Sequence, residues 1–141
     1  MEKVLVKRLS DQAILPTRAS PLSAGLDLYS AHSLVIQPHE RGVISTDISV
    51  RVPPSTYARV AGRSGLALSQ GISILGGVCD EGYTGNIRII TFNTGNTPFT
   101  VSPGQRVAQL IIERISYAVV EEVSELPTTV RGDTGFGSSG L

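Results

Sequence analysis

The feature that most constrains the fold of this chain is the recurrence of short apolar runs rich in valine and isoleucine, each ended by turn residues. Valine and isoleucine number 26 against 13 leucines in 141 residues, and glycine and proline together number 23. β-Branched residues favour strands, whereas glycine and proline end them. No segment shows a helical period over about 12 residues or more. Strands recurring at about ten-residue intervals predict an all-β fold, either a sandwich or a barrel.

The expected elements are a series of strands and one short helical turn. The strands are expected at residues 4–9, 34–36, 42–45, 48–52, 57–61, 72–75, 87–93, 99–101 and 107–115. The helical turn is expected at residues 65–69, ended by Gly71, because glycine commonly ends helices. Residues 87–92 begin as an alternation and then become continuously apolar, which predicts a central strand covered on both faces.

Charge and composition exclude several classes of protein. The 12 basic residues balance the 12 acidic ones, so the positive surplus that nucleic acids or membrane surfaces attract is lacking. The sequence contains no apolar run of about 18 residues and no apolar signal core. A single cysteine, Cys79, cannot form an internal disulfide. We therefore expect an intracellular protein, cytoplasmic or nuclear, with no nucleic-acid and no membrane partner.

The end of the chain differs in composition from the rest. Residues 128–141 hold four glycines, five serines or threonines and one aromatic residue, Phe136. Such a segment cannot build its own core, so we predict one domain at 1–126 and a flexible arm at 127–141. The arm is either a frayed terminus or a segment that closes over a ligand. Its Arg131-Gly132-Asp133 is the adhesion tripeptide when read alone, an interpretation that the intracellular composition disfavours.

Candidate chemistry lies in five patches of polar residues and glycine. The histidines do not contribute, because His32 and His39 with one cysteine make no zinc site, and we expect both on the surface. In the first patch, Asp27 is either a turn carboxylate or a carboxylate that reaches Mg²⁺, directly or through water. In the second, Arg63-Ser64 forms either a plain strand-to-helix turn or an anion site.

The third patch, residues 76–86, is a glycine-rich reversal between two apolar runs, which predicts a hairpin. Asp80 follows apolar residues, so we expect it to be partly desolvated and suited to act as a general base. Glu81 is expected to face water. Tyr83 either packs against the fold or offers a flat wall to a sugar.

The fourth patch, residues 104–111, places a glutamine in an apolar strand. Alternation predicts Val107 and Gln109 on one face, where the glutamine needs a polar partner. The fifth patch is residues 131–140 of the arm, which combines an arginine, a phenylalanine and a glycine–serine cluster.

The order and spacing of these five patches closely resemble the trimeric, all-β deoxyuridine triphosphatase (dUTPase) family over essentially the whole chain. Residues 15–18, 46–47, 52–53 and 92–93 also resemble the framework of that family. The resemblance implies a distorted jelly-roll β-barrel and a homotrimer whose active sites are shared between subunits. It also implies Mg²⁺-assisted hydrolysis of dUTP to dUMP and pyrophosphate by water attack on the α-phosphate. This reaction limits uracil in DNA and supplies dUMP for thymidylate synthesis.

The resemblance further implies a role for each matching residue. Asp80 would activate the attacking water, and Asp27 would hold the water shell of the magnesium ion. Tyr83 would stack on the deoxyribose and leave no room for a 2′-hydroxyl. The phosphate-binding residues implied are Arg63, Ser64, Gly65, Gln109 and Arg131. For the uracil base, the resemblance implies contacts from the backbone of the hairpin from Ile74 to Arg88, near Gly77 and Val78. Phe136 would cover the uracil ring, and Gly137 and Ser138 would close the arm over the site.

The sequence departs from the family pattern at several positions, while the five key side chains are present. Gly62 replaces a usual proline, Cys79 a usual isoleucine or valine, Gln105 a usual acid, Thr134 a usual glycine and Ser139 a usual threonine. Thr134 would be strained if its position needs a positive φ, which would weaken closure of the arm.

Three alternatives to an active dUTPase remain. One is a regulatory or interaction protein on the same scaffold with weakened catalysis. Another is a related deoxycytidine triphosphate deaminase, which shares the jelly roll and would release ammonia. The most distant is a jelly-roll capsid or lectin protein, which gives no reason for five polar patches.

Overall fold

The computed structural model describes residues 1–138 and residue 140, so the predicted departure at Ser139 lies outside the described residues. Within them the chain forms 11 strands and one helix. These are β1 (Leu5–Arg8), β2 (Leu26–Tyr29), β3 (Leu34–Ile36), β4 (Arg41–Ser45), β5 (Ile48–Arg51), β6 (Thr56–Ala61), α1 (Ser64–Gln70), β7 (Ile72–Leu75), β8 (Val78–Cys79), β9 (Arg88–Asn93), β10 (Phe99–Val101) and β11 (Arg106–Arg114).

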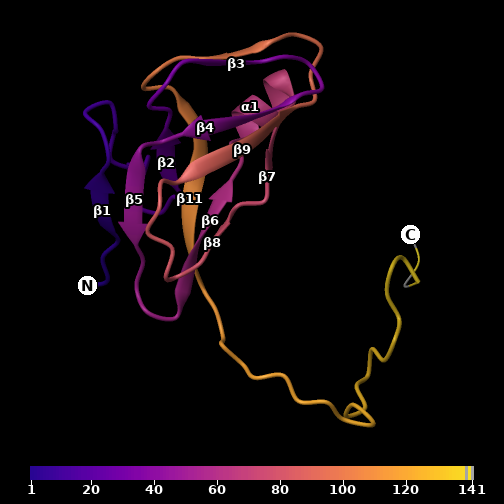
Figure 1. The fold of residues 1–141 in the computed structure, drawn as a ribbon. Helices are drawn as coiled ribbons and strands as arrows, with labels where there is room; N and C mark the ends of the chain where they lie inside the picture. The colour runs from indigo at the N-terminus through magenta and orange to yellow at the C-terminus, as the bar shows by residue number, and fades with distance from the viewer. Residues whose placement is uncertain (139, 141) are drawn as a thin grey trace.

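The strands form four antiparallel sheets around one apolar core (Figure 1). The largest has the order β2-β11-β6-β8, and the next β4-β9-β7, while β1 pairs with β5 and β3 with β10. Fully buried side chains from several of these strands meet in the core, among them Leu28, Ile44, Ile48, Ile89 and Leu110. The predicted all-β fold, a distorted jelly-roll barrel, is confirmed.

Two strands were not predicted, and each carries part of the candidate site. β2 is four residues long and contains Asp27, a residue type that is depleted in strands. β8 is only two residues long and follows two glycines, so its pattern is that of a turn. Both strands exist because β11 and β6, respectively, offer them backbone partners. The predicted helical turn is α1, and Gly71 ends it with a φ of 69°.

β9 is central, as predicted, because it pairs with β4 on one side and β7 on the other. The prediction that both of its faces are covered is wrong. Ile89 and Thr91 are fully buried, whereas Ile90 between them is 42% exposed. An apolar run does not distinguish a covered face from an apolar face that lines an open pocket, and the latter is the case here.

After β11 the chain leaves the barrel. Figure 1 shows residues 115–138 running outward from the sheets. Its apolar side chains, such as Val119, Val120 and Leu126, are exposed, and no strand or helix follows β11 among the described residues. A domain boundary at residue 127 stays a prediction. No described helix has both the length and the apolar character needed to cross a membrane.

Candidate functional site

The carboxylate of Asp27 lies between two arginines. Asp27 is on β2, opposite Gln109 of β11, and its side chain is only 12% exposed, so the turn interpretation is wrong. Its Oδ1 is 3.7 Å from Nε of Arg63, and its Oδ2 is 3.7 Å from an Nη of Arg106. These distances exceed direct hydrogen bonds, so both oxygens keep lone pairs for other donors.

Arg106 was not among the predicted site residues. The only signal available was its place in the fourth patch, next to the glutamine that the pattern singled out. In the structure its guanidinium lies over the ring of Tyr29, 5.8 Å from the ring centroid, and its carbonyl accepts a 3.5 Å hydrogen bond from Arg63. Two guanidinium groups therefore flank one nearly buried carboxylate, and they make this corner suited to an anion.

Gln109 has the polar partner that its apolar strand required. Its Nε2 donates a 2.8 Å hydrogen bond to the carbonyl of Gly62. A side chain on Gly25 would collide with the Gln109 amide, so the close approach needs glycine there. The predicted shared face with Val107 is wrong, because the register shifts between Arg106 and Ala108 and Val107 turns into the core.

The second patch opens a short helix whose start is uncapped. Arg63 is the residue before α1, and in the described structure its side chain caps no backbone group. Ser64 and Gly65 follow it and are exposed. The Arg63 guanidinium thus lies close to the Asp27 carboxylate, and the Ser64 hydroxyl next to it along the chain is open to an anion.

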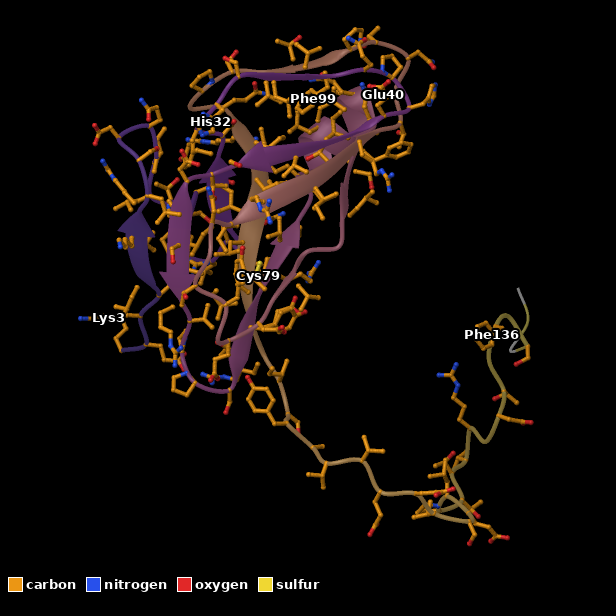
Figure 2. The ribbon with its side chains drawn as sticks, in the orientation of Figure 1. Lys3, His32, Glu40, Cys79, Phe99 and Phe136 are labelled. Carbon is orange, nitrogen blue, oxygen red and sulfur yellow. The ribbon has the colours of Figure 1, made fainter. Side chains whose placement is uncertain are left out.

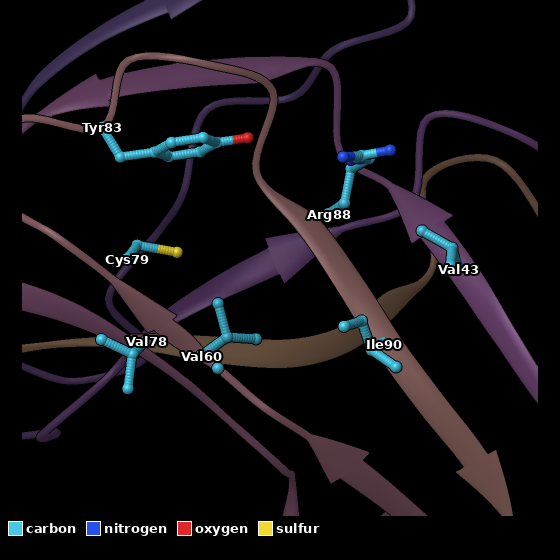
Figure 3. A pocket seen from close by; sticks show the side chains of 8 residues that line it. Val43, Val60, Val78, Cys79, Tyr83, Arg88 and Ile90 are labelled. Atoms are coloured by element: carbon cyan, nitrogen blue, oxygen red, sulfur yellow. The ribbon is translucent and has the colours of Figure 1, made fainter.

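A pocket of about 300 Å³ lies between β4, β6, β8 and β9 (Figure 3). Four of its lining residues were predicted for the base and sugar: Gly77, Val78, Tyr83 and Arg88. Sequence reasoning missed the others as binding residues: Val43, Val60, Cys79 and Ile90. Val43 and Ile90 face each other across β4 and β9 and are both exposed. Predicted Ile74 lies on β7, outside this lining.

Gly77 brings the pocket wall close to β6. Its φ is 102°, and a Cβ at this position would lie 2.5 Å from the carbonyl oxygen of Val60. The carbonyl of Gly77 in turn accepts a 2.8 Å hydrogen bond from the Val60 N–H. Only glycine combines this φ with this approach, which leaves main-chain groups to form the edge of the pocket.

The two carboxylates of the hairpin lie in surroundings opposite to those predicted. Asp80 is exposed, whereas Glu81 is half-buried and accepts a 2.5 Å hydrogen bond from the Ser55 N–H. Alternation along β8 is the reason, because it turns Cys79 inward and leaves Val78 and Asp80 outward. Asp80 is thus accessible from solvent and directly follows Cys79 of the pocket wall.

Cys79 is a filler of the pocket wall rather than a nucleophile. Burial, together with the negative charge of Asp80, raises the pKa of its thiol. The group therefore stays neutral at physiological pH, and thiols react as thiolates. Cys79 and the histidines form no metal cluster, and no group of three or more metal-ligating side chains gathers anywhere in residues 1–138 or at residue 140.

The arm residues lie away from both parts of the site. Arg131, Phe136, Gly137 and Ser138 are exposed, and Figure 2 shows Phe136 far from Cys79 and the barrel. Arg131 donates a 2.8 Å hydrogen bond from Nε to the carbonyl of Thr134 within a local turn. Thr134 does not have a positive φ, so the strain considered for it is absent in this turn.

One chain therefore holds the predicted residues in three separate groups. Asp27, Arg63 and Gln109 form the first, the pocket residues the second and the arm the third. Among the described residues no hydrogen bond or ion pair links Asp80 or Tyr83 to Asp27, Arg63 or Arg131.

Comparison with known proteins gives one consistent family. A family model described as dUTPase matches residues 11–140. Two relatives are named deoxyuridine 5′-triphosphate nucleotidohydrolase. The Rabbitpox virus protein is 54% identical over an alignment that covers 94% of this chain and 89% of the relative. The Yaba monkey tumor virus protein is 46% identical over an alignment that covers 98% of this chain and 96% of the relative.

Solved structures agree in fold. The Staphylococcus bacteriophage 80alpha dUTPase with dUPNHPP superposes with a TM-score of 0.95 at 30% identity, covering all of both chains. A point mutant of the dUTPase from phage phi11 of S. aureus, described as coordinating a structural Mg(II) ion, superposes with a TM-score of 0.83 at 27% identity over 87% of this chain and 97% of its own.

Proposed function

Because the chain belongs to the dUTPase family, we propose that it hydrolyses dUTP to dUMP and pyrophosphate, and that the three groups of residues described above form its active site. One observation carries the assignment of residues: four residues predicted to contact the base and sugar, Gly77, Val78, Tyr83 and Arg88, line a single pocket. The physiological result would be less uracil in DNA and a supply of dUMP for thymidylate synthesis, inside the cell, in the cytoplasm or nucleus.

The corner around Asp27 is proposed to bind the triphosphate. Arg63, Ser64 and Gln109 would contact phosphate oxygens, and Arg106 would add positive charge beside them. The structure offers a single nearly buried carboxylate here rather than a cage of ligands, which fits a Mg²⁺ ion that keeps its waters and arrives with the phosphates. When bound, the ion would neutralise phosphate charge, and Asp27 would accept hydrogen bonds from its water shell.

Asp80 is proposed to act as the general base. It would take a proton from a water molecule while the water oxygen bonds to the α-phosphorus. The bond from that phosphorus to the bridging oxygen breaks, and pyrophosphate leaves. Positioning and charge neutralisation supply most of the rate enhancement in such transfers, so the arginines are as necessary as the base.

The pocket is proposed to select deoxyuridine. Main-chain groups at its Gly77 edge would pair with the uracil edge and reject cytosine, whose exocyclic amine reverses the pattern. The close walls, Val60 and Val78 opposite Tyr83 and Arg88 in Figure 3, would exclude the 5-methyl group of thymine. The Tyr83 ring would leave no room for a 2′-hydroxyl.

A complete site is proposed to need three copies of the chain. Among the described residues no hydrogen bond or ion pair joins the Asp27 corner, Tyr83 of the pocket and Arg131 of the arm in one chain, and the arm exposes Arg131 and Phe136 away from its own barrel. Closed symmetric assembly would let the arm of one copy cover the pocket of another. Phe136 would then cover the uracil ring, with Gly137 and Ser138 closing the cap.

Proton release from purified protein tests this function. Given dUTP, dTTP, dCTP and UTP in turn with Mg²⁺, the protein should release protons and pyrophosphate with dUTP alone. Ammonia release from dCTP would instead identify a deaminase. An inert protein that binds dUTP would identify a regulatory member of the family.

A further inference from the structure

Asp47 links four segments of the barrel. It lies in the turn between β4 and β5 with a φ of 55° and is only 7% exposed. Its Oδ2 accepts a 2.7 Å hydrogen bond from Oγ of Ser10 and lies 2.8 Å from Nε2 of His32. Its Oδ1 accepts a 2.9 Å hydrogen bond from Nδ2 of Asn86. A buried carboxylate needs such partners, and this one has three.

Asn86 is held by Asp47 from two sides. Besides donating to the carboxylate, its Oδ1 accepts a 3.0 Å hydrogen bond from the Asp47 N–H. Both bonds involve the Asn86 side chain, and they tie residue 86 to a buried turn. Asn86 directly precedes the buried Ile87, whose N–H donates to the Ile48 carbonyl at 2.9 Å.

The main-chain carbonyl of Asn86 in turn holds the pocket tyrosine. It accepts a 2.8 Å hydrogen bond from the hydroxyl of Tyr83. The ring lies so close to Gly85 that a Cβ there would be 2.6 Å from the hydroxyl oxygen. The direction of the ring thus depends on the position of the Asn86 carbonyl, and that position depends on Asp47.

We propose that Asp47 is a positioning residue for Tyr83 and, through Asn86, determines how well the site rejects ribonucleotides. The inference rests on the proposed function, in which the Tyr83 ring lies against the sugar. A displacement of about 1 Å in a positioned group can change rates by up to about 100-fold. Asp47 itself lines no part of the pocket, so its effect on specificity would be indirect.

The test compares variants that break the link at different points. Asp47→Gly removes the carboxylate and tolerates the positive φ, and Asn86→Ala removes the amide but leaves Ser10 and His32 bound to Asp47. Both should lower the ratio of kcat/KM for dUTP to that for UTP by about tenfold. KM for dUTP should rise more than kcat falls, because Asp80 and the phosphate corner are untouched. Asp47→Asn, which keeps one acceptor oxygen, should restore most of the ratio.

Ser10→Ala is the matched control, because it removes a donor to the same carboxylate on the oxygen that does not face Asn86. It should lower the melting temperature and leave the ratio unchanged. In a Tyr83→Phe background, which lacks the hydroxyl that Asn86 holds, Asp47→Gly should change the ratio by less than about twofold.

A second readout needs no turnover. In protein labelled with ¹³C-tyrosine, the ring signals assigned through Tyr83→Phe should shift in Asp47→Gly and Asn86→Ala but not in Ser10→Ala. Unshifted signals, or an unchanged dUTP-to-UTP ratio in both variants, would show that Asp47 only stabilises the fold. A wild-type protein that fails to hydrolyse dUTP would contradict the proposed function instead, and the tyrosine signals would still decide the role of Asp47.

Discussion

Adjacent residues of the hairpin take different roles because strand alternation separates their side chains. Asp80 projects outward beside the pocket wall, while Cys79 turns inward with a pKa raised by burial and by the Asp80 charge. The Glu81 carboxylate accepts a hydrogen bond from the Ser55 N–H. Of the three side chains, only Asp80 is a carboxylate free to accept a proton from water.

Asp80→Asn should therefore abolish most turnover and spare the fold. A general base contributes about 10²–10⁴-fold, so kcat should fall within that range. Binding of dUTP with Mg²⁺, measured by calorimetry, should persist, and the melting temperature should change little because Asp80 is exposed. Glu81→Gln, which keeps an acceptor for Ser55, is the matched control and should remain active. Near-normal turnover of Asp80→Asn would assign the base elsewhere.

The arm, residues 127–141, has no partner within the single chain that would explain its arginine and phenylalanine among the described residues. Within residues 127–138 and residue 140 it makes no strand with its own barrel, and the hydrogen bonds of these residues join near neighbours such as Arg131 and Thr134. An exposed arm of this composition has little effect on stability. In the proposed site, its arginine and phenylalanine would act only when substrate and another copy of the chain are present.

Deleting residues 130–141 should leave a folded trimer with very low activity. The loss should fall mainly on kcat if the arm acts in the transition state, because only differential binding lowers the barrier. Arg131→Ala should lower kcat almost as much as the deletion, since it removes a charge-assisted contact to phosphate. Phe136→Ala should lower kcat less, because stacking is worth about 1–3 kcal/mol per base. The three variants are compared by steady-state kinetics at saturating dUTP and Mg²⁺. Wild-type turnover of the deletion would show the arm to be a frayed end.

At the scale of the whole molecule, the separation of the three groups of site residues predicts assembly. Light scattering should give a trimer, and a fully active monomer would overturn the shared site. A barrel whose pocket exposes Val43 and Ile90, and whose segment after β11 exposes Val119, Val120 and Val123, has apolar surface to cover.

Mixing two inactive variants tests the sharing directly. Asp80→Asn chains and chains lacking residues 130–141, unfolded and refolded together in equal amounts, should recover activity. If Asp80 and the arm at one site come from different copies, about a quarter of sites in random trimers have both intact. If both came from one chain, the mixture would stay inactive, and separately refolded samples are the control.

Acid should destabilise the barrel partly through Asp47. Burial alone would raise its pKa, but hydrogen bonds from Ser10, Asn86 and His32 and the charge of His32 outweigh it and lower the pKa below the ordinary 3.8. A lowered pKa means that ionised Asp47 favours the folded state. This stabilisation is complete above the ordinary pKa and is lost as pH falls through the folded value.

Urea unfolding between neutral pH and about pH 3 measures this contribution. Asp47→Asn should be less stable than the wild type at neutral pH, and the difference should shrink below about pH 4. Asp133→Asn on the exposed arm should follow the wild-type curve. A constant gap between the Asp47→Asn and wild-type curves would show that Asp47 does not contribute through its ionisation.

The sequence by itself determined the class of fold, most strands and the residue types of the site. These are local properties: β-branched runs between turns specify strands, and the spacing of Asp27, Arg63, Asp80, Gln109 and Arg131 identifies the family. Only the tertiary structure decided what depends on partners far along the chain. β2 and β8 exist because β11 and β6 pair with them, and a bulge turns Val107 away from the Gln109 face. Asp80 is exposed and Asp47 buried because the hairpin and the β4–β5 turn pack that way, and no local pattern records such packing.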